Sequence, residues 1–445
     1  MKQDTAGELD PLVSLLLKSP PDAGGLGTPV ADARYQAREA FLALGLPTRK
    51  DENWRYTDLA LVRRTAFRMA TQSDVFRPVD RLPRLLGAGR GAARLVFVNG
   101  GFRADLSSLT GLPDGFSAAS LAQQPDADRA ATIAQPLGQP VLRGHGSLIS
   151  LNAAMADDGV VISVDEAAAG DVWIEIVFVG GASEPVAYAL RNTVRVGAGA
   201  RLGLIEHHLA VPEGAAFANA VMRVELENGA CLHHYRVVEG NPGSATVTTS
   251  FADVGEDAQY EAFSLSVGGG LNRVETTVEL AGVRANCRIG GAYAIAGSDI
   301  CDNTTMVAHR APKTTSRQVF RGVVDDRAHA VFQGRVIVDR AAQEADGHQL
   351  SKVLLLSPAA EIDQKPALEI FADNVKCSHG AAAGQLDPTA MFYLRSRGLP
   401  EATARQMLLE GFLAEVLLEV SDEEVRRQLT QRVLTAVGAN GREME

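Results

Sequence analysis

A cysteine and a histidine stand two residues apart late in the chain, in the segment KCSHG at residues 376–380. Side chains at positions i and i+2 of a strand project from the same face, so Cys377 and His379 are predicted to address one metal ion or cluster. The pair ends an alternating strand pattern that starts at Leu368, and two strongly marked helices follow directly. Thiolate and imidazole ligate zinc and iron–sulfur clusters, but two ligands complete neither site. We therefore expect the other ligands to come from elsewhere, including from a second chain.

Two further histidine pairs, His207–His208 and His233–His234, are separated by 26 residues. This separation is close to one coil of a solenoid, so one histidine of each pair is expected to meet the other near Glu206 and Cys231. A metal site is one interpretation of such a cluster, and a ladder of polar side chains along the solenoid is the commoner one. Cys287 and Cys301 are expected to be small buried apolar residues.

Strands follow one another from about residue 160 to about residue 375, in β-branched or alternating segments separated by Gly, Asn and Asp. A small residue before a new strand recurs at Ala200, Ala230, Ala258, Ala285, Ala328 and Ala360. Most of these steps are near 30 residues long, and the step from Ala285 to Ala328 is longer. A repeat of this length in strands predicts a solenoid, because one coil cannot bury its apolar face alone. A parallel β-helix is therefore favoured over the alternative, a β-sandwich.

Helical patterns flank the strands. Before them, a helix ending at Gly45 is expected to present an apolar face of Tyr35, Phe41, Leu42 and Leu44. A hairpin with its turn at 99–100 or 100–101 follows, and then a helix from Leu148. We expect three parts: an N-terminal helical and mixed α/β region at 1–155, the β-helix core at 156–381 and a C-terminal helical region at 382–445.

The C-terminal region is punctuated as three helices. Asp387 and Pro388 are typical of a helix start, and Gly398 of its end. The second helix begins at Pro400, and its expected apolar stripe is Ala404, Met407, Leu408, Phe412 and Leu413. Ser421 and Glu424 predict a capping box for a third helix that runs to about Val437.

The composition excludes several classes of function. The 445 residues carry a net charge of −11 and no polybasic run, which argues against nucleic acid or a membrane surface as a partner. The N-terminus lacks a signal peptide and no long apolar run is present, so a cytoplasmic protein is expected. Two glycine-rich pieces, at 87–94 and 267–272, match no phosphate-binding motif and are expected to be loops. We therefore expect no ATP site in this chain.

Four segments resemble the SufD branch of the SufB/SufD family, the scaffold subunits of the SUF iron–sulfur cluster assembly complex. They are PTRKDENWRYTDL (47–59), AVFQGRVIV (330–338), LLLSPAAEIDQKPALEIFADNVKCSHGA (354–381) and FYLRSRG (392–398). The paralogue SufB usually has E-H-E where this chain has Cys377, Ser378 and His379. The resemblance implies a right-handed parallel β-helix between helical regions, in agreement with the residue pattern.

The resemblance also implies partners and a role for the Cys–His pair. The family pairs with SufB through the β-helix ends and recruits the ABC-type ATPase SufC, which supplies the ATPase activity, so this subunit itself is expected to be non-catalytic. Cys377 and His379 would stand at that junction and contact a nascent Fe–S cluster shared with SufB. Docking of the ATPase would involve Phe392, Arg395, Arg397 and Gly398. A homodimer of the isolated chain, an indirect link to a desulfurase or sulfur carrier, and a reduced flavin in the complex are further expectations, although no flavin motif is visible here.

Two other functions stay open at this point. A purely structural adaptor would anchor the ATPase and position SufB without any ligand role for Cys377 and His379. A free-standing β-helix enzyme would need a nucleophile and base pair, which the sequence does not offer.

Overall fold

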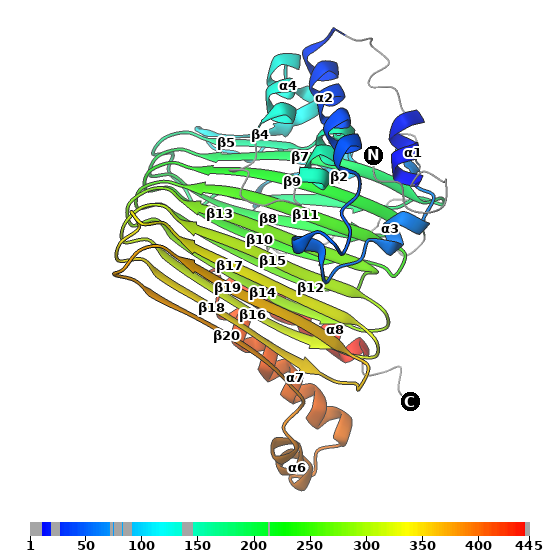
Figure 1. Ribbon diagram of the computed structural model, residues 1–445, viewed down its shortest axis with the longest axis vertical. Coiled ribbons are helices and arrows are strands. Elements are labelled where there is room, and N and C mark those ends of the chain that lie inside the picture. Colours follow the sequence, from blue (N-terminus) through cyan, green and yellow to red (C-terminus); the bar gives the residue numbers. More distant parts are fainter. Residues whose placement is uncertain are drawn as a thin grey trace.

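The computed structural model of the protein describes residues 11–18, 27–71, 74, 82, 91–135, 146–211 and 214–440. Strands wind into a parallel β-solenoid of about seven turns over residues 161–384, with helices at both ends of the chain (Figure 1). Each coil contributes one strand to each of two sheets, so the odd-numbered strands from β5 onward form one sheet and the even-numbered strands from β6 onward form the other. The predicted parallel β-helix is confirmed.

The two sheets are built from strands of similar length. The odd sheet contains β5 (Val160–Val164), β7 (Val186–Val196), β9 (Ala216–Leu226), β11 (Ala245–Val254), β13 (Leu271–Leu280), β15 (Ile300–His309), β17 (His329–Val338) and β19 (Glu361–Ile370), with β1 (Arg68–Met69) beside β7. The even sheet contains β6 (Trp173–Gly180), β8 (Arg201–Ala210), β10 (Cys231–Glu239), β12 (Gln259–Val267), β14 (Asn286–Ile295), β16 (Thr315–Val324), β18 (Asp346–Leu355) and β20 (Lys376–Gly384).

The recurring alanines mark the corners of the coils. Ala200, Ala230, Ala258 and Ala285 directly precede strands of the even sheet, whereas Ala328 and Ala360 precede strands of the odd sheet. All six are buried. The long step between Ala285 and Ala328 is therefore a change from one corner to the other, and the coil itself keeps its length.

The two ends of the solenoid differ. At the start, the antiparallel strand β4 (Phe116–Ser120) covers β5, and the hairpin of β2 (Gly91–Val98) and β3 (Gly101–Phe102) covers β6. The hairpin turn is Asn99–Gly100, both with positive φ as a two-residue type I′ turn requires. At the other end, β19 and β20 each pair with one strand only, so the last coil is uncapped within the described part of the chain.

Short helices and turns precede the solenoid; most pack near its start, whereas the segment at 47–59 lies across the odd sheet further along (Figure 1). They are α1 (Pro11–Lys18), α2 (Pro29–Leu44), η1 (Glu52–Trp54), α3 (Ala60–Arg64), η2 (Ala104–Leu106), η3 (Leu121–Gln123), α4 (Asp126–Ala134) and α5 (Gly146–Met155). The expected apolar face of α2 is partly wrong, since Tyr35 and Leu44 are exposed while Phe41 is buried. The face that packs on α4 and α5 instead uses smaller residues, including Val30 and Ala33.

Three helices follow the solenoid: α6 (Pro388–Ser396), α7 (Glu401–Leu417) and α8 (Glu423–Asn440). α7 and α8 pack on the outer face of the even sheet through a shared apolar cluster. The stripe expected on α7 is partly wrong, because Met407 is exposed and Leu409 and Val416 are buried in its place. Ser421 does not cap α8: its hydroxyl donates to Glu261 on the sheet, and Asp422 Oδ1 accepts from Val425 N instead (3.0 Å). None of the described helices is both long and apolar enough to cross a membrane.

The two glycine-rich pieces have different outcomes. Residues 87–90 lie outside the described residues, whereas Gly91 to Arg94 begin strand β2 and so correct the expected loop. In the second piece, Gly268 and Gly269 have positive φ and form the turn from β12 to β13, as expected.

Candidate functional site

The Cys–His pair lies on the last strand of the even sheet. The strand pattern that starts at Leu368 breaks after Ile370, where β19 ends, and β20 begins anew at Lys376. Cys377 and His379 are therefore near the start of their own strand, which corrects the expectation that they end the preceding one. Ala372 extends the apolar alternation of Leu368 and Ile370, and Val375 with Cys377 resumes it after Asp373 and Asn374, so the sequence shows little sign of the break. The remainder of β20, GAAAG at 380–384, carries no β-branched residue and gave no strand signal.

Cys377 is half-buried at the mouth of the solenoid. Its side chain packs against an apolar cluster that includes Val336, Val338 and Ala345. Its neighbour in the β18 register is Gly347, so no side chain stands beside the thiol on the adjacent strand. Burial raises the pKa of the Cys377 thiol, and the nearby Asp346 carboxylate adds to this effect, whereas a backbone hydrogen bond from Gly347 opposes it. The group is therefore held mainly as a thiol near neutral pH.

His379 lies one alternation further along β20 and is exposed. Its register neighbour on β18 is the buried Gln349. Because strand side chains alternate, His379 projects from the same face as Cys377, and Ser378 from the opposite face. Ser378 Oγ indeed lies 2.6 Å from Nδ1 of His348, whose other nitrogen lies 2.6 Å from Asp346. The strand geometry thus agrees with the expected common face for the thiol and the imidazole.

The edge around this pair is open to a partner. Natural edge strands are usually blunted by charges or covered, but β20 carries no Asp, Glu, Lys or Arg after Lys376. Large apolar residues, Ile370 and Phe371, are exposed where β19 ends, and Phe371 is 60% exposed. An edge strand with one unpaired side and small side chains, beside exposed apolar residues, is typical of a surface that another sheet continues.

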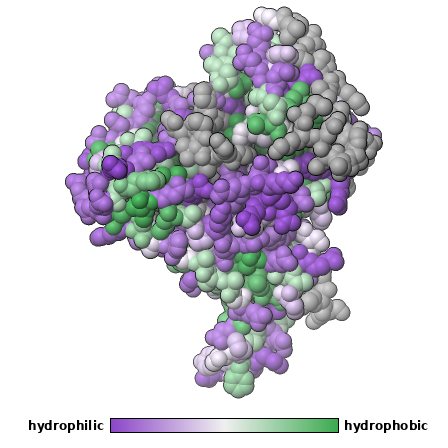
Figure 2. Space-filling view, in the orientation of Figure 1, coloured by the Kyte–Doolittle hydropathy of each residue, from purple (hydrophilic) through white to green (hydrophobic). Residues whose placement is uncertain are grey.

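Helix α6 is joined directly to the strand of the Cys–His pair. Only residues 385–387 separate the end of β20 from Pro388, and Asp387 caps the helix by accepting from Thr389 N (2.8 Å). α6 buries none of its own residues and projects from the molecule (Figure 1). Polar and apolar side chains lie side by side on this projecting end (Figure 2).

The four expected docking residues lie on or just after α6. Phe392 is 73% exposed, Arg395 pairs with Glu401 (3.1 Å), and the Arg397 guanidinium lies over the Tyr393 ring (5.3 Å to its centroid). Gly398 ends the helix with a φ of 89°. Their exposure leaves these residues accessible to a partner, and the contacts given above stabilise only the local structure.

The histidine pairs meet at Glu206 inside the solenoid. The Glu206 carboxylate lies 2.6 Å from Nε2 of His208 and 2.8 Å from Nε2 of His234, and it accepts a hydrogen bond from Arg236 (2.9 Å). These four side chains are buried. Despite the cost of burial, Arg236 and the histidines hold the pKa of Glu206 well below its usual range.

One histidine of each pair therefore lies in this cluster, as expected, but Cys231 does not. His207 instead lies 2.9 Å from Glu175 on the outer face of the sheet. Within the described residues no group of three or more His, Cys, Asp or Glu side chains is arranged to hold a metal ion. The cluster fits a polar ladder, with Arg236 as the member that no sequence motif signalled.

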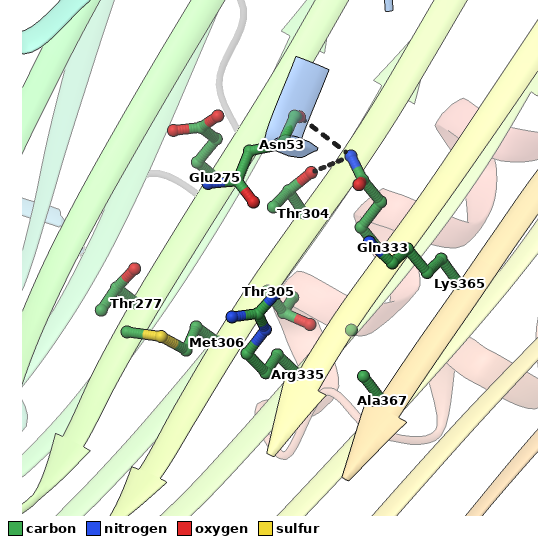
Figure 3. A pocket seen from close by; sticks show the side chains of 11 residues that line it. Asn53, Glu275, Thr277, Thr304, Thr305, Met306, Gln333, Arg335, Lys365 and Ala367 are labelled. Carbon is green, nitrogen blue, oxygen red and sulfur yellow. Dashed lines mark hydrogen bonds between the residues drawn. The ribbon is translucent and has the colours of Figure 1, made fainter. Parts of the chain in front are cut away.

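The segment at 47–59 packs on the odd sheet and is called the clamp below. Arg273, which is fully buried, donates to Asn53 O (2.9 Å), forms an ion pair with Asp302, and lies over the Trp54 ring at 3.9 Å. Thr57 donates to the same Asp302 carboxylate. A small recess of about 30 Å³ remains beside this contact, where Gln333 donates to Asn53 O (3.1 Å) and Thr304 (Figure 3).

This recess is a packing feature of the clamp. Its two cations are already engaged, since Lys365 lies 2.9 Å from Glu52 and Arg335 lies 3.3 Å from the same carboxylate. A recess of about 30 Å³ holds no more than a few water molecules. The segment 47–59 also presents a hydrophilic surface over the odd sheet (Figure 2). The sequence predicts no structural role for the segment 47–59, because the residues that it contacts on the odd sheet lie more than 200 residues away.

Comparison with known proteins agrees with this architecture. A family model for the SufBD core domain of SUF system FeS cluster assembly matches residues 178–412, and one for the SufBD protein N-terminal region matches residues 26–176. The iron–sulfur cluster assembly protein SufD of Escherichia coli K12 is 30% identical, over 92% of this chain and 93% of its own length. A SufBD family protein of Synechocystis is 28% identical over 96% of the chain, and the chloroplastic protein ABCI7 of Arabidopsis thaliana is 29% identical over 95%. These two matches cover 95% of the Synechocystis protein and 90% of ABCI7.

Proposed function

Because this chain belongs to the SufBD family of iron–sulfur cluster assembly proteins, we propose that it is a SufD-type scaffold subunit that pairs with a SufB paralogue. The observation that carries the proposal is the uncapped last coil, where β19 and β20 each lack a second neighbour in the described chain. A paralogue with the same fold offers matching strands, so both subunits could bury their open edges together.

Cys377 and His379 would then lie inside the junction. The nascent cluster is the cargo of this site, and the two side chains would be transient ligands that complete a set supplied mainly by the paralogue. Since Cys377 is held mainly as a thiol, iron must displace its proton on binding, and ligation becomes weaker as the pH falls. His379 is exposed on the isolated chain and accessible without rearrangement.

The projecting helix α6 would dock the ABC-type ATPase SufC. Phe392 and Tyr393 supply exposed aromatic surface, which is the residue type that anchors protein interfaces. α6 continues β20 after residues 385–387, so movement of a docked ATPase acts directly on the strand of the Cys–His pair. β20 is paired on one side only, and α7 beyond α6 is fixed to the even sheet. ATP-driven closure would thus shift β20 against a rigid solenoid and open the junction.

The test is cluster assembly by the complete complex. This chain is co-expressed with its cognate SufB and SufC, reconstituted with iron and sulfide without oxygen, and followed by visible absorption. We expect a Cys377→Ser/His379→Ala variant to form the complex but lose most of the cluster absorption. Ser378→Ala is the matched control, since it changes the same strand on the opposite face. Normal cluster assembly in the double variant would reject the ligand role.

A structural adaptor is the second candidate function. It is favoured by the half-buried, protonated state of Cys377, which is a poor nucleophile and needs deprotonation to bind metal. The adaptor predicts that the Cys377→Ser/His379→Ala variant is silent, whereas removal of residues 388–445 abolishes ATPase binding. The same complex and assay therefore separate the two functions.

A further inference from the structure

The interior of the solenoid is polar along part of its axis. Inward-facing positions near the start are filled by aliphatic and aromatic side chains such as Leu204, Leu232 and Ile176. Towards the open end, buried polar side chains replace them, and several of their atoms have no hydrogen-bond partner among the described residues. These atoms are Thr248 Oγ1, Ser266 Oγ, Gln318 Nε2, both amide atoms of Gln349, Ser351 Oγ and Gln364 Oε1.

Gln318 and Gln349 stand in a series of inward-facing polar residues that runs, through hydrogen bonds or strand register, from the Glu206 cluster to His379. Arg236, which binds Glu206, donates to Ser250 Oγ on the opposite sheet (2.7 Å). Thr276 and then Thr305 follow Ser250 on successive strands of the odd sheet. Thr305 Oγ1 donates back across the interior to Gln318 Oε1 (2.6 Å).

The series continues along the even sheet to the open end. Gln349 is the register neighbour of Gln318, and His379 is the register neighbour of Gln349. The Gln349 amide extends towards the opposite sheet, because a Cβ placed on Gly334 would lie 3.1 Å from both of its polar atoms. A side chain at position 334 would therefore meet this amide, and it would also clash with the Phe332 ring, whose Cζ lies 2.8 Å from the same point. The Gln349 side chain is itself 3% exposed, so bulk solvent does not satisfy its amide.

Gln318 and Gln349 have buried amide atoms without a direct partner. Register neighbours in this sheet can bond directly, as Asn286 Nδ2 does with Thr315 Oγ1. Gln318 and Gln349 are register neighbours as well, yet Gln318 Nε2 and both amide atoms of Gln349 have no partner among the described residues. Buried polar groups are nearly always hydrogen-bonded to protein or to ordered water, and one water molecule bridges two such groups. We propose that the solenoid encloses a line of ordered water molecules, held by Gln318 and Gln349, that ends at His379.

The water line gives the Cys–His pair hydration from inside the molecule. If a paralogue covers the open end, bulk water is excluded from Cys377 and His379, but the interior side of the site stays wet. The line would keep His379 in hydrogen-bonded contact with the interior while the junction is closed. This consequence rests on the proposed function, whereas the internal water itself does not.

The first test measures water in the full-length chain alone, without partner, iron or sulfide. Oxygen-17 magnetic relaxation dispersion detects water molecules with long residence times, and a crystal structure at high resolution locates them. We expect ordered water within hydrogen-bonding distance of both Gln318 and Gln349. If the electron density shows no water at either amide, and relaxation dispersion detects no long-lived water in solution, the proposal is wrong.

Two substitutions test the same point through stability. Gln349→Met keeps the side-chain length but cannot bind water, and Gln349→Asn keeps the amide. If water satisfies the amide, Gln349→Met lowers the urea midpoint and removes long-lived water, and Gln349→Asn lowers the midpoint less. If the interior is dry, Gln349→Met removes an unsatisfied amide and the midpoint rises, which contradicts the proposal.

Leu368→Met is the matched control, an apolar exchange facing the interior of the same end. It should leave the number of long-lived water molecules unchanged. Loss of the same water in this control would also contradict the proposal, because the water would then not depend on the glutamine amides. Neither outcome depends on cluster assembly, so failure here is distinguishable from failure of the proposed function.

Discussion

His309 makes the stability of this protein depend on pH in a defined range. The imidazole is fully buried at the end of β15, and burial lowers its pKa to about 4. Thr314 Oγ1 donates to Ala311 O (3.0 Å), so it accepts from Nδ1 of His309 (2.8 Å), and Nε2 accepts from Ser316 (2.9 Å). The neutral Nδ1–H tautomer thus satisfies both ring nitrogens without a charge.

The magnitude follows from the two pKa values. The unfolded chain takes up a proton at His309 below its ordinary pKa of 6.5, whereas the folded chain does so only near 4. Folding therefore opposes protonation, and the free energy of unfolding falls as the pH drops from 6.5 towards 4. At about 1.4 kcal/mol for each pH unit, the full loss is about 3 kcal/mol, of which about 2.5 kcal/mol is lost by pH 4.5.

The assay is urea unfolding at several pH values between about 7.5 and about 4.5, followed by tryptophan fluorescence. His309→Gln removes the ionisable group and keeps a neutral hydrogen-bonding side chain. We expect its stability to fall less steeply than that of the wild type, by about 2 kcal/mol over this range. His348→Gln, on an exposed histidine, should leave the slope within about 0.5 kcal/mol of wild type. Equal slopes for His309→Gln and the wild type would refute the reasoning.

Three other predictions concern charge burial, docking and thiol access. Glu206→Gln leaves Arg236 buried without a counter-charge and should lower the free energy of unfolding in urea by about 3–5 kcal/mol. Glu256→Gln, at an exposed ion pair, should lower it by less than about 1 kcal/mol. Equal losses of stability in the two variants would contradict the assigned burial. Phe392→Ser with Tyr393→Ser should abolish co-purification of the ATPase. Each substitution should change the free energy of unfolding by less than about 0.5 kcal/mol, because α6 has no buried residues. A large loss of stability would show that α6 is packed. Iodoacetamide should modify Cys377 alone in the native chain, slowly at neutral pH and faster at alkaline pH because its pKa is raised; intact mass showing several fast adducts would disagree with the burial of the other three cysteines.

Much of the fold follows from local patterns in the sequence. The solenoid was predicted because small corner residues recur at one coil length, and the caps of α2 and α6 were visible as Gly45 and as Asp387–Pro388. The buried faces of the helices were less predictable, because the surface of the chain on which a helix packs decides which of its residues are buried. Met407 is as apolar as Leu409, and only the position of the even sheet decides which of them is covered.

The candidate site was predictable only in part. Alternation placed Cys377 and His379 on one face, but nothing local indicated that their strand is the last of the sheet, since that depends on which strands are absent beyond it. The ion pairs of Arg236 and Arg273 were missed for a different reason. Arg236 faces the interior, and its counter-charge Glu206 comes from the neighbouring coil. Arg273 faces outward but is covered by Asn53 and Trp54, and it pairs with Asp302 of the next coil as well as with Glu275 of its own strand.

The difference between the two ends of the solenoid limits the size of any assembly built on it. The start is bordered by β4, antiparallel to β5, and by the two-residue β3, antiparallel to β2, so it does not present the long parallel edges found at the open end. Head-to-tail addition, which would produce a filament, therefore finds no matching parallel edge at the start. An open end can pair only with another open end, and this pairing leaves neither of the two ends free. Growth through strand pairing then stops at two subunits, whether the second is an identical copy or a relative with the same fold.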